Sequence, residues 1–159
     1  MNHTYLLTGG NLGNRMENLE AAKNAIMQQV GPIKKASSVY ETAAWGKETQ
    51  PDYLNQVLAV DTDYTAEELI AVLLKIEAQL GRIRQEKYDS RLIDIDILFF
   101  NSDIIQLPNL TIPHPRLQQR RFVLEPLCEI APQFIHPVLR QSMAELLQAC
   151  NDPLYVKKF

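Results

Sequence analysis

The chain has 159 residues, of which 46% are hydrophobic and 22% are charged, and its formal net charge at pH 7 is -3. This length and composition predict one soluble globular domain spanning residues 1–159. The acidic balance argues against a general nucleic-acid-binding protein, and no apolar run is long enough to span a membrane. Two cysteines without metal-ligand spacing, and an N-terminus unlike a signal peptide, favour a cytoplasmic protein, which we expect to be a monomer.

The first half of the chain predicts a strand, a helix and two further strands. Asn14, with Glu17 three residues later, is typical of a helix start, and Gly31 is typical of a helix end. The segments on either side are rich in β-branched and aromatic residues. In chain order, we expect a strand at 4–8, a helix at 15–30, a strand at 33–42, a loop at 43–52 and a strand at 53–62.

The second half of the chain opens with another helix and another strand. Thr65 and Glu68 have the spacing of a capping box, apolar residues follow at helical spacing, and Gly81 ends the helix. After a loop at 82–90, β-forming residues predict a strand that runs to Phe100. The resulting β-α-β-β-α-β order is typical of a ferredoxin-like α+β fold, with an antiparallel sheet and helices on its face. Beyond it we expect a C-terminal extension with a short hairpin and a helix at 142–150.

Asp94 and Asp96 stand two positions apart in the strand-like run from Arg91 to Phe100. Because alternate side chains of a strand point to opposite faces, both carboxylates should emerge on one face, about 6–7 Å apart at the backbone. Like charges that close need a cation or a proton between them. Mg2+ is the natural cation, since it is commonly held by one or two carboxylates together with substrate phosphates. The alternative for the pair alone is a solvated strand face.

Basic residues gather in two segments of this acidic chain, at 82–91 and at 116–121. Their arginines are Arg82, Arg84, Arg91, Arg116, Arg120 and Arg121. Such local patches suit a small anion such as a polyphosphate better than a nucleic-acid duplex. His114, which lies between two prolines, could bind phosphate or act as an acid beside the second segment, or it could have a structural role only.

Aromatic and amide side chains offer a second kind of binding group. Trp45, Tyr53 and Phe122 could each be a core residue, but together with Asn55 they could clasp a planar heterocycle. The glycine-rich segment 9–13 follows a strand and opens a helix, yet it lacks the lysine of a P-loop. We interpret it as a tight turn at which a flat ligand could approach the backbone.

Taken together, these motifs resemble the 6-hydroxymethyl-7,8-dihydropterin pyrophosphokinase family over essentially the full length of the chain. The matching segments are Gly9–Leu12, Ser38–Thr42, Gln50–Asn55, Glu77–Arg84, Arg91–Asp96, Thr111–His114 and Arg120–Phe122. The chain departs from the family pattern at Gly10, where serine is common, near Ala43, where proline is usual, and at Tyr88, where tryptophan often covers the site.

The resemblance implies an enzyme of folate biosynthesis that transfers pyrophosphate from ATP to the pterin's hydroxymethyl oxygen and releases AMP, with two Mg2+ ions at Asp94 and Asp96. The catalytic residues it implies are Arg82, Arg91, Asp94 and Asp96. The ATP-binding residues it implies are Glu77, Arg82, Arg84, Arg91, Ile97, Thr111, His114 and Arg120. The pterin-binding residues it implies are Thr42, Ala43, Trp45, Tyr53, Asn55 and Phe122.

Two other functions fit parts of the pattern. A two-metal phosphohydrolase would also use paired aspartates, but it would need a third carboxylate that the sequence does not locate. A non-catalytic ferredoxin-like binding module would have little use for Asp94 and Asp96 on one face. The products formed from ATP, with and without the pterin, distinguish these alternatives.

Overall fold

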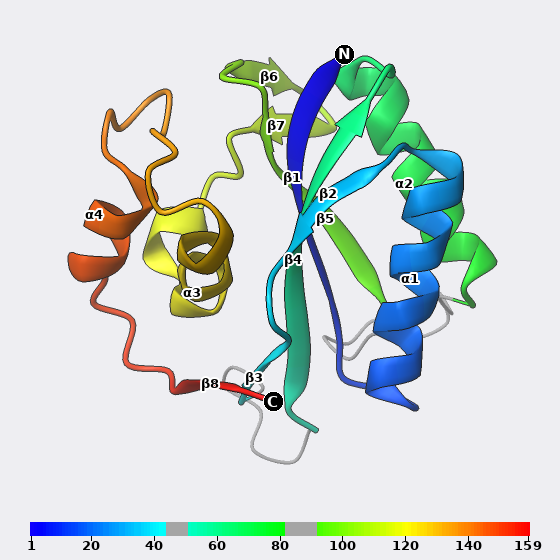
Figure 1. The fold of residues 1–159 in the computed structure, drawn as a ribbon, viewed down its shortest axis with the longest axis horizontal. Helices are drawn as coiled ribbons and strands as arrows, with labels where there is room; N and C mark the ends of the chain where they lie inside the picture. The colour runs from blue at the N-terminus through cyan, green and yellow to red at the C-terminus, as the bar shows by residue number, and fades with distance from the viewer. Residues whose placement is uncertain (44–50, 82–91) are drawn as a thin grey trace.

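The strand β1 (Asn2–Gly10) lies inside an antiparallel sheet in the computed structural model, which describes residues 1–43, 51–81 and 92–159. On one side β1 pairs with β4 (Tyr53–Thr62), and on the other it pairs with β5 (Asp94–Phe100). This places the strand that carries the two aspartates beside the N-terminal strand, at one edge of the sheet (Figure 1).

The far side of the sheet is made of shorter strands. Both β2 (Ile33–Ala36) and β3 (Tyr40–Thr42) pair with β4, and β8 (Val156–Lys158) pairs with β3. The sheet order β5-β1-β4-β3-β8, with every pairing antiparallel, confirms the predicted α+β fold with its β-α-β-β-α-β core. The predicted hairpin follows β5 and consists of β6 (Ile105–Leu107) and β7 (Leu110–Ile112).

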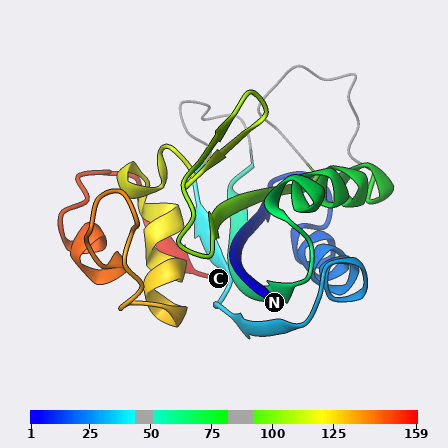
Figure 2. The ribbon, with the colours of Figure 1, turned by 90° about the horizontal axis from the view of Figure 1, so that it is seen from above.

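Helices cover both faces of the sheet. On one face lie α1 (Arg15–Gln29) and α2 (Ala66–Gln79), and on the other lie α3 (Arg121–Ile130) and α4 (Met143–Gln148), as Figure 2 shows from above. The 3-10 helix η1 (Leu117–Gln119) precedes α3. In the described part of the chain, no helix is long and apolar enough to cross a membrane.

Three helices start where local side chains cap them. The Asn14 side chain accepts a hydrogen bond from Glu17 N, as the sequence predicts for α1. Thr65 and Glu68 form the expected capping box before α2, and Ser142 forms another before α4. Such caps satisfy backbone N–H groups that have no partner inside the helix.

The predicted single strand at 33–42 is wrong in detail, because the structure divides it into β2 and β3. Ser37 causes the interruption: its Oγ accepts a hydrogen bond from Val57 N at 2.9 Å, in place of a backbone carbonyl. The next residue turns away from the sheet, and both its N–H and its hydroxyl donate to the Glu129 carboxylate on α3. Local side-chain bonds of this kind compete with a regular strand ladder.

The sequence did not predict α3 or its coverage of the second face. No capping side chain precedes this helix, and Pro126 lies inside it. Proline lacks the N–H that a helix interior needs, so the pattern indicates irregular chain. Packing compensates for both features, because Val123, Leu124 and Leu127 of α3 are buried in a second apolar core.

The two faces of the sheet therefore carry separate cores. Ile93, Ile95 and Ile97 pack with α1 and α2 in the first core. Leu7, Val57 and Leu98 pack with α3 and α4 in the second. The alternation along β5 consequently turns Asp94 and Asp96 toward the α3 side of the sheet.

His136 lies between α3 and α4, and its environment predicts that the free energy of unfolding depends on pH. Its Nδ1 accepts hydrogen bonds from the backbone N–H groups of Val138 and Leu139, both at 3.1 Å, and its ring packs edge-on against Phe99. Burial lowers the pKa of His136 in the folded protein. Because the unfolded chain binds this proton more readily, the free energy of unfolding should fall as pH decreases through about 6.5.

We expect the variant H136N to show a flatter pH dependence, since the amide oxygen of asparagine can accept the same N–H groups without titrating. The measurement is urea unfolding of both proteins at several pH values between about 5 and about 7.5. Subtracting the two curves removes the contribution of every other titrating group. Parallel curves would contradict the role given to His136.

Candidate active site

Asp94 and Asp96 are held on a strand whose backbone is fixed from both sides. On the inner side, Gly9 and Leu7 of β1 lie opposite Asp94 and Asp96 in the antiparallel register. On the outer side, the buried Glu77 carboxylate of α2 accepts a hydrogen bond from Ile95 N at 2.7 Å. The backbone between the two aspartates is therefore anchored, and so are the two positions from which their side chains emerge.

Gly9 creates room on the same face of the sheet. It pairs with Asp94 on one side and with Asn55 on the other, so all three residues point toward α3. A methyl group on Gly9 would collide with Oδ1 of Asn55 and would lie 3.2 Å from the Leu54 carbonyl oxygen. The missing side chain lets the Asn55 amide lie across β1 and leaves the backbone open to a ligand.

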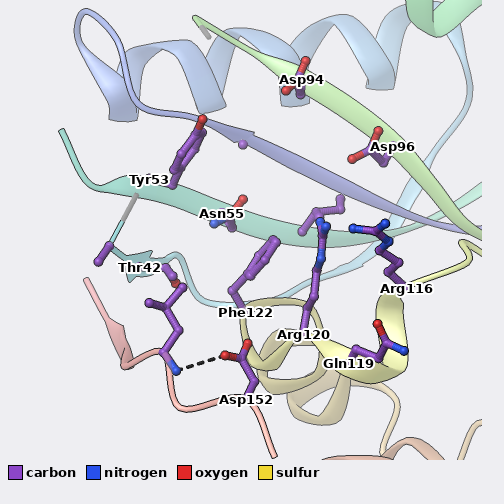
Figure 3. Close-up of a pocket in the computed structure, with 14 residues that line it drawn as sticks. Thr42, Tyr53, Asn55, Asp94, Asp96, Arg116, Gln119, Arg120, Phe122 and Asp152 are labelled. Carbon is purple, nitrogen blue, oxygen red and sulfur yellow. Dashed lines mark hydrogen bonds between the residues drawn. The ribbon is translucent and has the colours of Figure 1, made fainter. Parts of the chain in front are cut away.

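A cavity of about 530 Å³ lies over these residues, between the sheet and the start of α3. This volume is within the usual range of small-molecule sites. Figure 3 shows Asp94 and Asp96 along β5, across the cavity from Phe122 and Arg120. The lining residues are Leu7, Gly9, Thr42, Ala43, Tyr53, Asn55, Asp94, Asp96, Arg116, Gln119, Arg120, Phe122, Asp152 and Leu154.

One polar atom of this cavity lacks a partner within the described structure. The Thr42 Oγ1 atom is buried and makes no hydrogen bond there. Buried hydroxyls are almost always hydrogen-bonded, so an orphan in a cavity wall indicates a polar ligand atom. Because Tyr53 and Phe122 add flat apolar surfaces and Asn55 adds an amide, the cavity suits a planar heterocycle with polar edges.

A second cavity, of about 320 Å³, lies beside the β6–β7 hairpin. Its lining residues are Ile70, Asp96, Ile97, Pro108, Asn109, Leu110, Thr111, His114 and Pro115. Among the residues that the structure describes, Asp96 lines both cavities, whereas the others line one or the other. A group that passes between ligands in the two cavities would therefore pass beside the Asp96 carboxylate.

Positive charge faces the two aspartates across the cavities. Arg116 and Arg120 line the first cavity, and the Arg120 guanidinium lies 5.8 Å from the centre of the Phe122 ring. Burial lowers the pKa of His114, and the neighbouring Arg120 and Arg116 lower it further. This cluster is suited to a multiply charged anion, which would offset the mutual repulsion of the cations.

The oxygen ligands available at the two aspartates suit a metal ion that is also bound by phosphate. Asp94 and Asp96 supply hard oxygen donors, but in the described ranges no group of three or more His, Cys, Asp or Glu side chains could hold an ion. Mg2+ is usually bound by one or two carboxylates, with water and substrate phosphates completing its octahedron. The pair therefore fits Mg2+ better than a metal that needs a full set of protein ligands.

Most of the predicted site residues come together around the two cavities. The first is lined by the predicted Thr42, Ala43, Tyr53, Asn55, Asp94, Asp96, Arg120 and Phe122, and the second by the predicted Ile97, Thr111 and His114. Glu77 lines neither and lies behind β5. The predictions for Trp45, Arg82, Arg84 and Arg91 fall outside the described residues.

Sequence reasoning missed some lining residues and misjudged one arginine. Arg116 belongs to the basic segment 116–121, and this was the one feature of the sequence that could have assigned it to the cavity. Asp152 and Leu154 gave no signal, because only the folded C-terminal segment brings them to the cavity. Arg121, grouped with the anion-binding arginines, instead donates to the carbonyl oxygens of Cys150 and Asp152.

Comparisons with known proteins agree on one family. A family model described as 7,8-dihydro-6-hydroxymethylpterin-pyrophosphokinase matches residues 5–132. The chain is 39% identical over 141 residues to the 2-amino-4-hydroxy-6-hydroxymethyldihydropteridine pyrophosphokinase of Aquifex aeolicus, covering 89% of this chain and 88% of that protein. The protein of the same name from Haemophilus influenzae is 36% identical over 154 residues, covering 96% of each chain.

Solved structures show the same fold at lower sequence identity. The wild-type Plasmodium falciparum HPPK-DHPS, crystallised with SDX-DHP, superposes with a TM-score of 0.74 at 18% identity. The match covers 94% of this chain and 43% of that longer chain. The likeness therefore concerns one part of the larger protein, and it supports the fold alone.

Because Gly9 and Asn55 are in contact, substitutions at these two positions should have non-additive effects on the free energy of unfolding. The variant G9A should lower the free energy of unfolding by about 1–3 kcal/mol, because the new methyl group displaces the Asn55 amide. In an N55A background the same substitution should cost less, since the colliding oxygen is gone. Chemical denaturation of the four proteins of this double-mutant cycle measures the coupling. An equal cost of G9A in both backgrounds would contradict the predicted contact.

Proposed function

Because the chain belongs to the 7,8-dihydro-6-hydroxymethylpterin-pyrophosphokinase family, we propose that it transfers the pyrophosphoryl group of ATP to the hydroxymethyl group of 6-hydroxymethyl-7,8-dihydropterin. The hydroxymethyl oxygen loses its proton and bonds to the β-phosphorus. The bond between the β-phosphorus and the oxygen that bridges it to the α-phosphorus breaks, and AMP leaves with that oxygen. The single observation that carries this proposal is the position of Asp96, which lines both of two cavities with different linings.

The first cavity is the proposed pterin site. The ring stacks on Phe122, while the Asn55 amide and the orphan Thr42 hydroxyl offer hydrogen bonds to its polar edge. Tyr53 and Ala43 complete the walls of the slot. Trp45, assigned from the family resemblance, would add to the same pocket. In this position the hydroxymethyl group points toward the aspartates of β5.

The second cavity is the proposed nucleotide site. Apolar residues such as Ile97 suit the adenine ring, and Thr111 and His114 offer polar contacts. Arg120 and Arg116 line the first cavity, where they can meet the phosphate chain of the nucleotide. The family resemblance adds Arg82, Arg84 and Arg91 as phosphate ligands. The same resemblance assigns Glu77 to the nucleotide site. We propose instead that Glu77 positions the aspartates by accepting a hydrogen bond from Ile95 N.

Two Mg2+ ions, held by Asp94 and Asp96 together with the phosphates, would neutralise the phosphate charge and align the attacking and leaving oxygens. The protein residues contribute to the transfer by holding the carboxylates, the arginines and the two substrates in position. The β5 backbone fixes the carboxylates, and the arginines stabilise the negative charge that grows on the transferred group. The two adjoining slots bring the hydroxymethyl oxygen in line with the β-phosphorus, which is most of what phosphoryl transfer requires from a protein. We further propose that the enzyme acts as a monomer in the cytoplasm.

A quantitative assay of the products tests this function against the alternatives. Purified protein, ATP and Mg2+ should give AMP only when the pterin is added. Release of phosphate without the pterin would favour a phosphohydrolase instead. Ligand binding without any product would favour a binding module.

The variant D96N tests the metal site. Removing one carboxylate charge should lower kcat on the order of a thousandfold and weaken Mg-nucleotide binding, because the cation loses a negatively charged ligand. The fold should persist, because the Asp96 side chain is only partly buried and lies outside both apolar cores. Steady-state kinetics and calorimetry measure both effects. D103N, in an exposed turn after β5, serves as the matched control and should match the wild type. Wild-type turnover by D96N would contradict the assignment.

The variant T42V tests the role of the Thr42 hydroxyl, because it should not destabilise the fold but should weaken pterin binding. Replacing a buried hydroxyl that makes no hydrogen bond within residues 1–43, 51–81 and 92–159 by a methyl group should leave the free energy of unfolding unchanged or slightly raised. The dissociation constant of the pterin should rise about five- to tenfold, because one hydrogen bond to the ring is lost. Thermal unfolding and fluorescence titration measure the two effects. A less stable variant with unchanged pterin affinity would show that the hydroxyl serves the fold alone.

A further inference from the structure

The C-terminal segment, residues 150–159, forms part of the first cavity although it lies beyond residues 5–132, which the family model matches. Its strand β8 pairs with β3 next to Thr42, and Phe159 N donates to the Val39 carbonyl oxygen at 2.9 Å. Asp152 and Leu154 lie between α4 and β8, and both line the cavity. Asp152 is labelled in Figure 3. The segment is therefore fixed at both ends around a wall of the proposed pterin site.

Asp152 caps the helix that carries the proposed ring-stacking residue. The residue at the N-cap position of α3, Arg120, makes no capping hydrogen bond with its own side chain. Instead, Oδ2 of Asp152 accepts a hydrogen bond from Arg121 N at 3.0 Å, while its Oδ1 accepts one from Leu154 N at 3.0 Å. A carboxylate at this end of a helix satisfies an unpaired N–H group and interacts favourably with the helix dipole.

The side chain of Arg121 also binds the C-terminal segment. Its Nη2 donates to the Cys150 carbonyl oxygen at 3.0 Å, and its Nε donates to the Asp152 carbonyl oxygen at 3.3 Å. The two sequence neighbours of Arg121 are Arg120 and Phe122, and both line the cavity. The contacts between Arg121 and the C-terminal segment therefore set the position of a cation and an aromatic ring in the site.

We propose that Asp152 is a positioning residue for the pterin site and that Leu154 forms part of the wall against the ring. This inference rests on the proposed function of the first cavity. With the cap removed, the first turn of α3 is free to fray, and Phe122 must be ordered when the pterin binds. That ordering reduces the affinity for the pterin, so Asp152 acts on binding through its hydrogen bond to the backbone of α3.

The test compares the loss of this cap with the loss of another. Asp152→Ala removes the cap of α3, and Ser142→Ala removes the cap of α4, a helix none of whose described residues lines either cavity. Both variants should melt at a lower temperature than the wild type. Asp152→Ala should also raise the dissociation constant of 6-hydroxymethyl-7,8-dihydropterin about five- to tenfold, whereas Ser142→Ala should leave it unchanged.

Asp152→Asn provides the conservative variant. Its single carbonyl oxygen can accept one of the two hydrogen bonds, so its dissociation constant should lie between those of the wild type and Asp152→Ala. Equal pterin affinity in Asp152→Ala, Ser142→Ala and the wild type would overturn the proposal. If Asp152→Ala does not fold, Asp152→Asn alone decides between a raised and an unchanged dissociation constant.

A second pair of variants tests the wall. Leu154 lines the cavity, whereas its neighbour Tyr155 is 73% exposed. Leu154→Ala should raise the pterin dissociation constant several-fold, and Tyr155→Ala should not change it. The same constant for both variants would overturn the role of Leu154. If the wild type does not bind the pterin, the proposed function itself fails; if it binds and no variant differs, only the role of the C-terminal segment fails.

Discussion

The constraint on which the site depends is the alternation of side chains along β5. Its isoleucines are buried against α1 and α2, so the strand cannot rotate without exposing them, and Asp94 and Asp96 must face the other way. The burial of one face thus holds two like charges near each other on the opposite face. The Glu77 carboxylate adds a second restraint by binding the peptide N–H between them. Core packing therefore fixes the positions on the sheet from which both carboxylates can reach a bound cation.

The second face of the sheet divides into a packed part and an open part. Near α4, Leu98, Phe99 and their neighbours form an apolar core. Near the start of α3 this core gives way to the first cavity, whose lining includes polar side chains such as Asn55 and to which Gly9 contributes no side chain. The same surface thus provides both stability and a binding cavity. Because Asp96 lies where this cavity meets the one beside the hairpin, the two proposed substrates can approach each other without a change of fold.

The sequence was informative wherever a local pattern decides the structure. The caps at Asn14 and Thr65 mark real helix starts, and the strand at 53–62 has the predicted bounds. The aspartate pair was also recognisable, since alternation alone determines that both carboxylates share a face. Local patterns could not reveal α3, whose start is capped by a residue 31 positions later in the chain. For the same reason the contribution of Asp152 and Leu154 to the cavity appears only in the folded chain.

A crystal structure with Mg2+, a non-hydrolysable ATP analogue and the pterin would show whether Asp94 and Asp96 hold the metal. We expect magnesium about 2.0–2.1 Å from carboxylate oxygens of both residues. We also expect the phosphate chain beside Asp96 and the pterin ring against Phe122. Magnesium bound only to phosphates and water, with both carboxylates turned to solvent, would show that the aspartates do not form the metal site.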